Sequence, residues 1–166
     1  MRSIAARSGS SVAHNGPAGS TGGAESPACS SCESRVASCD SCAAVVNLAF
    51  DPALLRVTQE LQKEGFGVLT EIDVKATMKK KLNADMPPYR ILGACNPQLA
   101  HRALTVEPQI GVLLPCNVVV REDEAGKVHV EFMDPNAVLE LVNRPEVTQL
   151  AGEVRQRLQR VMAALP

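Results

Sequence analysis

The chain has 166 residues, of which 45% are apolar and 2% aromatic, and its formal net charge is −1. This length and composition predict one compact domain with an additional tail. A near-neutral charge and so few aromatic rings exclude the usual electrostatic and stacking surfaces of nucleic-acid-binding proteins. No apolar run approaches the ~20 residues that cross a bilayer, so a soluble protein without a membrane partner is expected.

Residues 1–42 differ in composition from the rest of the chain. They are rich in Ser, Gly and Ala and show no apolar period, which predicts a disordered leader. Up to Ala24 the leader contains Arg2 and Arg7 and no acidic residue, which is the charge balance of a transit segment. No signal peptide is recognisable, so reduced thiols in the cytoplasm are expected, or in a mitochondrion or plastid if the leader directs import.

Four cysteines of the leader form two CxxC pairs, and they are Cys29, Cys32, Cys39 and Cys42. Paired CxxC units are typical of zinc sites, because each pair can hold one side of a tetrahedral ion. The interval between the pairs is shorter than the usual ~15–20 residues. A redox-sensing tail and an incidental cysteine-rich leader therefore stay open as alternatives to metal binding.

The folded part is expected to begin at Ala43, giving a domain over residues 43–166. Residues 43–49 read as a strand, and a helix capped by Asp51 follows and ends at Gly65. Residues 67–72 read as a second strand, after which Asp73 caps a short helix that ends in three lysines.

The middle of the chain predicts three more strands. Residues 89–95 form the first, and Asn96 with the proline after it begins a short helix. The next is expected over residues 110–120, with a bulge or an edge at Pro115 because proline donates no ladder hydrogen bond. A polar turn leads into residues 127–133, which alternate cleanly and complete a hairpin.

The chain ends in two helices. Asp134 and the proline after it predict a short apolar helix, and residues 147–165 carry apolar side chains at steps of three and four. Gly152 lowers the stability of this last helix unless another backbone approaches it. The element order predicts a two-layer α+β domain with one sheet face covered by helices and with short inserted helices.

Three stretches in this order, residues 64–73, 89–97 and 113–120, resemble domain-of-unknown-function family 302. The resemblance runs from about Ala43 to Leu165. It implies a β-α-β(4)-α domain and a homodimer, and it implies no established activity. The leader lies outside it.

Cys95 and Cys116 each lie at or within an apolar strand, and each precedes an asparagine, Asn96 or Asn117. If the two strands are neighbours, the thiols could lie close together as a redox or metal-binding pair. A helix start directly after Cys95 can lower its thiol pKa from ~8.5 by a unit or more, which favours a nucleophile. Alternatively, both cysteines are small buried hydrophobic residues and Asn96 is only a helix cap.

Three other side chains bear on this site. His101 lies about one turn into the helix after Cys95 and is a candidate base, whereas His129 is expected to face solvent. Glu71 closes an otherwise apolar strand, and together with Cys95 and Cys116 it would form a mixed thiolate–carboxylate pocket. Thiolates favour zinc, copper or iron over magnesium, so the predicted cofactor is zinc or another thiophilic metal, if any.

The chain contains no GxGxxG, GxxxxGK[ST], HExxH or GxSxG motif, so common nucleotide-binding and hydrolase classes lose support. The first hypothesis is a protein that binds a small ligand or metal through Cys95, Asn96, Cys116, Asn117 and Glu71. The second is a thiol-dependent enzyme with Cys95 as nucleophile. The third is a structural or interaction module in which both cysteines are core residues.

Overall fold

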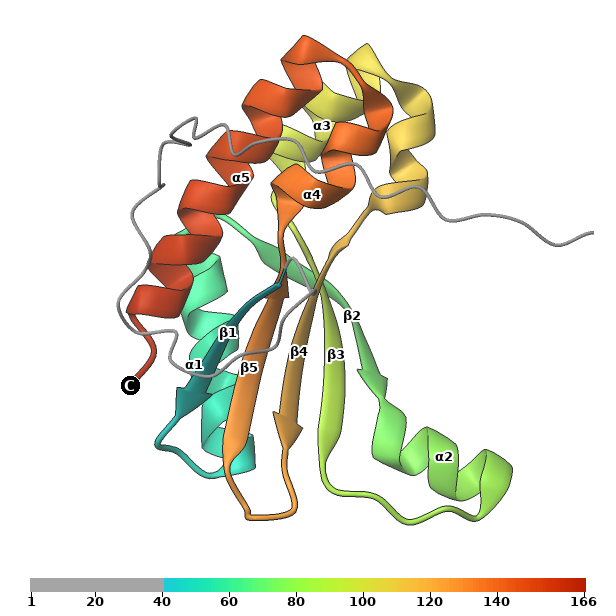
Figure 1. Cartoon of the computed structure of the whole chain (residues 1–166), viewed down its shortest axis with the longest axis vertical. Coiled ribbons are helices and arrows are strands. Elements are labelled where there is room, and N and C mark those ends of the chain that lie inside the picture. The colour runs from blue at the N-terminus through green and yellow to red at the C-terminus, as the bar shows by residue number, and fades with distance from the viewer. Residues whose placement is uncertain (1–40) are drawn as a thin grey trace, which may run out of the picture. The chain divides into compact units, whose positions relative to one another are not determined.

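The structure, a computed structural model, describes residues 41–166 (Figure 1). The strands are β1 (Ser41–Val46), β2 (Gly67–Asp73), β3 (Tyr89–Cys95), β4 (Cys116–Glu122) and β5 (Val128–Met133). The α-helices are α1 (Phe50–Lys63), α2 (Val74–Leu82), α3 (Pro97–Val106), α4 (Pro135–Leu139) and α5 (Pro145–Ala163), and two 3-10 helices are η1 (Pro108–Leu113) and η2 (Glu140–Val142). No helix within residues 41–166 is long and apolar enough to cross a membrane.

The five strands form one antiparallel sheet in the order β1-β5-β4-β3-β2. Helix α1 packs on the sheet and α5 packs beside α1, whereas α3 follows the end of β3 and packs against α5 (Figure 1). All three helices share one hydrophobic core with the strands. The α+β class and the β-α-β(4)-α order predicted from the sequence are therefore confirmed.

The core forms because alternate strand residues point toward the helices. In β4 and β5 these residues are Cys116, Val118, Val120, Val128, Val130 and Phe132, and all are buried. The periodic face of α5 meets them, and its buried members are Val147, Leu150, Ala151, Val154, Leu158 and Val161. The predicted amphipathic helix is confirmed.

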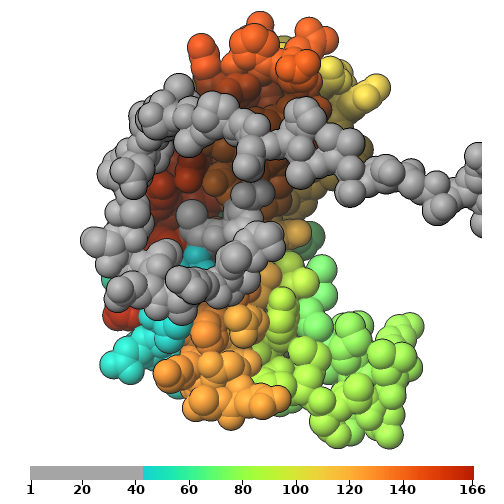
Figure 2. Space-filling model, viewed as in Figure 1, coloured from blue at the N-terminus to red at the C-terminus, as the bar shows by residue number. Residues whose placement is uncertain are grey.

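Three helices begin at the predicted caps. The Asp73 carboxylate accepts a hydrogen bond from the Ala76 N–H at 2.7 Å and caps α2. Asn96 Oδ1 accepts from the Leu99 N–H at 3.2 Å and caps α3, and Asp134 does the same for α4. Each cap satisfies an N–H that the first helical turn leaves without a partner. Helix α2 buries none of its side chains and stands away from the rest of the domain (Figure 2).

The first strand and the first helix start earlier than predicted. Strand β1 spans Ser41–Val46 and not residues 43–49, because the chain leaves the sheet at Asn47, whose N–H donates to a main-chain oxygen of Pro166 at 3.2 Å. Helix α1 begins at Phe50, so Asp51 lies in its first turn and is not its cap. An acidic side chain there still interacts favourably with the helix dipole.

The strand predicted over residues 110–120 is wrong in its first half. Residues up to Leu113 form η1, whose start is capped by Glu107 accepting from the Gln109 N–H at 3.2 Å. The Leu114–Pro115 peptide bond is cis, and β4 begins only at Cys116. Because Pro115 has no N–H to donate, strand pairing starts after it, and the irregularity expected there lies instead between Val68 and Thr70 in β2.

Replacing Gly152 by alanine should raise the free energy of unfolding by up to ~1 kcal/mol, because alanine is the better helix former. A Cβ at Gly152 would meet no atom within 4 Å, so no clash opposes the gain. Gly126 offers a matched control, since a Cβ there also meets open space but φ is +76°. Alanine at Gly126 should cost about 1 kcal/mol, and urea unfolding of both variants measures the contrast. Equal effects would show that backbone conformation does not decide the outcome.

Candidate functional site

Cys95 and Cys116 lie at the same end of the sheet, where β3 ends and β4 begins. Ala94 pairs with Cys116 across β3 and β4, and Gly67 pairs with Cys95 across β2 and β3. Both cysteines are free thiols. Cys116 is 7% exposed, whereas Cys95 is half-buried. Strands β3 and β4 are therefore neighbours, which was the condition for the two thiols to lie close together.

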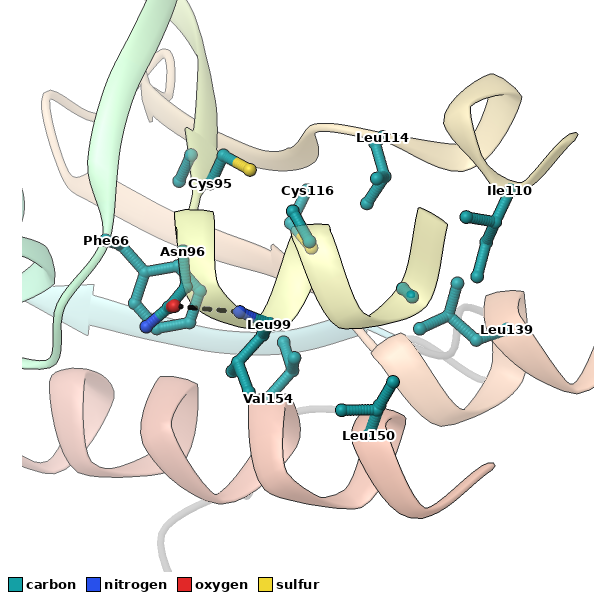
Figure 3. Close-up of a pocket in the computed structure, with 13 residues that line it drawn as sticks. Phe66, Cys95, Asn96, Leu99, Ile110, Leu114, Cys116, Leu139, Leu150 and Val154 are labelled. Atoms are coloured by element: carbon teal, nitrogen blue, oxygen red, sulfur yellow. Dashed lines mark hydrogen bonds between the residues drawn. The ribbon is translucent and has the colours of Figure 1, made fainter. Parts of the chain in front are cut away.

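Both cysteines line one cavity of about 30 Å³ beside α3 (Figure 3). A space of this size holds about two water-sized groups. The other lining residues are apolar except Asn96, and they are Phe66, Ala94, Leu99, Ala100, Ala103, Ile110, Leu114, Leu139, Leu150 and Val154. The interior end of the site is therefore narrow, and within residues 41–166 the two thiols are its only sulfur donors.

An open groove of about 360 Å³ lies on the surface beside this cavity. Its walls are mostly apolar and consist of Gln62, Gly65, Phe66, Gly67, Leu69, Cys95 and Pro97. Phe66 and Cys95 line both spaces. Cys95 thus has one side toward the surface and one toward the cavity that holds Cys116.

The expected lowering of the Cys95 pKa is wrong. Asn96 does begin α3 directly after Cys95, but burial raises the pKa of the Cys95 thiol above its ordinary value. Burial disfavours the charged thiolate, and it is the cause of the rise at Cys95. Burial also raises the pKa of Cys116, to about 11, and the nearby Cys95 adds to this rise. Both groups are therefore thiols at neutral pH in the absence of a bound cation.

Asn96 belongs to the site by position, and its cap role accounts for one of its polar atoms. Its Oδ1 is engaged by the Leu99 N–H. Its Nδ2 would lie 2.9 Å from a Cβ at Gly65, where φ is +82°. Gly65 thus allows the turn after α1 to approach the start of α3 closely.

Two predicted site residues lie elsewhere. His101 is exposed on α3 and does not line the cavity or the groove, so the structure does not place a base beside Cys95. Asn117 is exposed and points to the opposite face of the sheet from Cys116, because side chains alternate along β4. His129, expected to face solvent, is half-buried on that opposite face, where its Nε2 lies 2.8 Å from Asp123 Oδ2.

Glu71 is not brought to the cysteines, so the expected thiolate–carboxylate pocket is not formed. Its side chain is 49% exposed, and its Oε1 accepts a hydrogen bond from Arg90 Nε at 3.0 Å. Arg90 also pairs with Asp73. The backbone hydrogen bond from Ala76 and the Arg90 guanidinium hold the pKa of Asp73 below its usual value. The cluster therefore ties β2 to β3 at the start of α2.

Cys29, Cys32 and Cys39 lie outside the described residues, and so does the predicted transit segment. Cys42 lies in β1, and its side chain is outside the described part. Within the described residues no group of three or more His, Cys, Asp and Glu side chains is placed to hold a metal ion. A zinc site of the usual four ligands is therefore not present in that part of the chain.

The apolar residues that line the site were not predicted from the sequence. Phe66 is 2% exposed and lines both the cavity and the groove, and Leu69 lines the groove with 66% of its surface exposed. Phe66 lies between two glycines, in a stretch already singled out as a motif. That spacing of Gly65 and Gly67 around a large aromatic residue was the available signal.

The stability of the fold should depend on the Cys116 thiol in alkaline solution. Its pKa rises from 9.0 to about 11 on folding, so the folded state retains a proton that the unfolded chain loses. Stability is then fully present below pH 9 and falls by roughly 2–3 kcal/mol as the pH rises to 11. Urea unfolding of the wild-type chain and of Cys116→Val across this range isolates the effect. Parallel curves for the two proteins would contradict it.

Comparison with known proteins shows the family to which the chain belongs. The family described as "Domain of unknown function DUF302" matches residues 43–165. A crystal structure of the uncharacterized conserved protein DUF302 from Bacillus stearothermophilus has a TM-score of 0.71 and 27% sequence identity. The alignment covers 76% of this chain and 98% of that one. No curated protein matches. The chain belongs to the DUF302 family, as its motifs and element order predicted.

Proposed function

We propose that the domain binds a small ligand at Cys95 and Cys116, and that the ligand enters through the groove beside β2. The observation that carries this is the position of Cys95. It lines both the groove of about 360 Å³ and the cavity that contains Cys116. Ligand sites are typically concave, mostly apolar and of ~300–1,000 Å³, with few polar groups that fix orientation. The groove fits this description, and Asn96 and the thiols are the polar groups of the adjoining cavity.

A thiol-dependent enzyme is less well supported than a binding protein. A cysteine nucleophile needs a lowered pKa or an adjacent base. Burial raises the pKa of Cys95, and His101 lies on the exposed side of α3. Binding requires neither property, since a thiol can contact a ligand in its neutral form.

Native mass spectrometry of the anaerobically purified full-length chain tests the proposal. The leader cysteines are first replaced by serine, and this protein is called the leader-serine variant. It should carry a bound mass that is lost on further replacement of Cys95 by serine. Asn117→Ser is the matched control, because Asn117 is adjacent to Cys116 in sequence but faces away from the cavity. A bound mass that survives in Cys95→Ser would reject the proposed site.

We also propose that the protein forms a homodimer, as the family resemblance implied, through β2 and α2. Ile72 and Leu82 expose 49% and 71% of their surface there. Helix α2 has nine residues and no buried side chain, and isolated helices shorter than ~12–15 residues are marginal in water. A second copy packed against α2 would supply the missing contacts.

Light scattering after size exclusion measures the subunit number. Leu82→Glu should shift the protein toward monomer, because it places a charge in the proposed interface. Val112→Glu is the control, since Val112 is also an exposed apolar residue, at 87%, but lies in η1. A monomeric wild type would refute the dimer, and an unchanged dimer in Leu82→Glu would exclude this interface.

A further inference from the structure

The cavity between Cys95 and Cys116 offers an incoming ligand two sulfur atoms and little else. The other polar lining residue is Asn96, and its Oδ1 already accepts a hydrogen bond from Leu99. Within the described residues no third His, Cys, Asp or Glu side chain joins the two thiols. The described residues of the cavity therefore supply neither the four ligands that zinc takes nor the six or more oxygen ligands of hard cations.

The size of the cavity restricts the ligand further. About 30 Å³ leaves room for one ion, and hardly for an ion that keeps a shell of water. Apolar walls such as Leu99, Ile110 and Leu114 offer no ligand to such a shell. A suitable ion must be stable with two soft ligands and without water. Thiolates favour Cu(I), zinc and iron–sulfur clusters, and the four protein ligands that zinc and the clusters take are not offered by the described residues here.

We propose that Cys95 and Cys116 hold one soft monovalent cation of the Cu(I) class between their two sulfur atoms. This inference rests on the proposed function, because it names the ligand of the same cavity. Binding forms two metal–sulfur bonds and breaks two S–H bonds, and both protons leave to solvent. The metal is neither oxidised nor reduced, and the product is a bis-thiolate with one net negative charge.

The start of α3 offsets part of that charge. Helix α3 has ten residues and begins at Pro97, directly after Cys95 and its capping neighbour Asn96. The N–H groups at a helix start carry partial positive charge and favour a nearby anion. This end of the helix could not make the neutral Cys95 an anion against burial, but it can stabilise an anion that the metal has already created.

The groove supplies the path for the ion. Cys95 lines the groove and the cavity, whereas Cys116 lines only the cavity. An ion delivered at the surface therefore meets Cys95 first and is then shared with Cys116. Figure 3 shows both cysteines beside α3.

Titration of the reduced leader-serine variant with Cu(I), buffered by a competing chelator, tests the inference. We expect one Cu(I) per chain and an X-ray absorption spectrum of two sulfur ligands. Cys95→Ser and Cys116→Ser should each weaken binding by more than about 100-fold. That factor is the upper end of the loss when a residue that only supports a metal ligand is replaced, and here the ligand itself is replaced. Asn117→Ser should bind as before. Circular dichroism confirms that each variant is folded, and Cys116→Ala replaces the serine variant if that one is not.

Other outcomes would overturn the copper site, and one of them would leave the proposed function standing. Three or four ligands to copper, or preference for Zn(II) over Cu(I), would overturn the two-coordinate site. A disulfide between Cys95 and Cys116 in the anaerobically purified protein would also overturn it. A cysteine-dependent organic mass in native mass spectra with no Cu(I) uptake would refute the metal but leave the proposed function standing. Absence of any bound species and of Cu(I) uptake would reject both.

Discussion

Replacing Phe66 by alanine is expected to lower the free energy of unfolding by about 3–5 kcal/mol, the usual cost of emptying an aromatic core position. Phe66 is 2% exposed and lines both the groove and the cavity. Its removal should enlarge both spaces and should accelerate the alkylation of Cys116, which the native fold keeps 7% exposed. Urea unfolding measures the first effect, and the rate of iodoacetamide labelling under native conditions measures the second.

The control for this variant is Leu69→Ala on the outer wall of the same groove. Leu69 is 66% exposed, so the change should stay within about 0.5 kcal/mol. It should leave the labelling of Cys116 unchanged. If Phe66→Ala destabilised the fold without any faster labelling of Cys116, Phe66 would not limit access from the groove to Cys116.

Alanine at Gly93 is expected to destabilise the domain by about 3 kcal/mol, at the upper end of what overpacking costs. A Cβ there would collide with Thr70 Oγ1 and would lie 2.7 Å from the Pro115 Cγ. Thr70 can rotate about χ1, but the ring of Pro115 cannot move without its backbone. Relief of the clash therefore requires β3 to shift against the start of β4, where Cys116 lies.

Gly67→Ala is the matched control, because Gly67 is a strand glycine of the same region. The nearest atom to a Cβ at Gly67 is the Cys95 carbonyl oxygen at 4.0 Å, an ordinary contact. Its unfolding free energy should be unchanged or slightly raised. Comparable losses in both variants, measured by urea unfolding, would show that strand glycines in general matter here and that the clash does not.

The features predicted best are those determined over a few residues. Asp73, Asn96 and Asp134 cap their helices because the hydrogen bond joins residues two or three positions apart. The apolar face of α5 was predicted for the same reason, since its period lies within one segment. The short apolar run before Pro115 was misread as a strand, because periodicity does not distinguish a buried strand from a tight helical turn.

The candidate site was predicted only in part, because its environment comes from distant segments. Leu99, Leu139 and Leu150 meet across more than fifty positions of sequence to enclose the thiols. Their packing causes the burial that raises the Cys95 pKa, whereas the opposing helix start is visible in two adjacent residues. The adjacent residues therefore indicated a lowered pKa for Cys95, whereas burial by distant segments raises it. Glu71 shows the same limit, since its partner Arg90 lies on the next strand.

The order of strands in the sheet has a consequence for how the domain assembles. Strands β2 to β5 are neighbours both in sequence and in the sheet, whereas β1 pairs with β5, with Ser41 opposite Met133. Contacts between distant residues form slowly, because a long loop must close first. We therefore expect the chain to complete the four-stranded meander that carries Cys95 and Cys116 before its first strand docks. The end of the sheet that carries the two cysteines would then be shaped early, and the edge next to the leader would be the last part of the sheet to form.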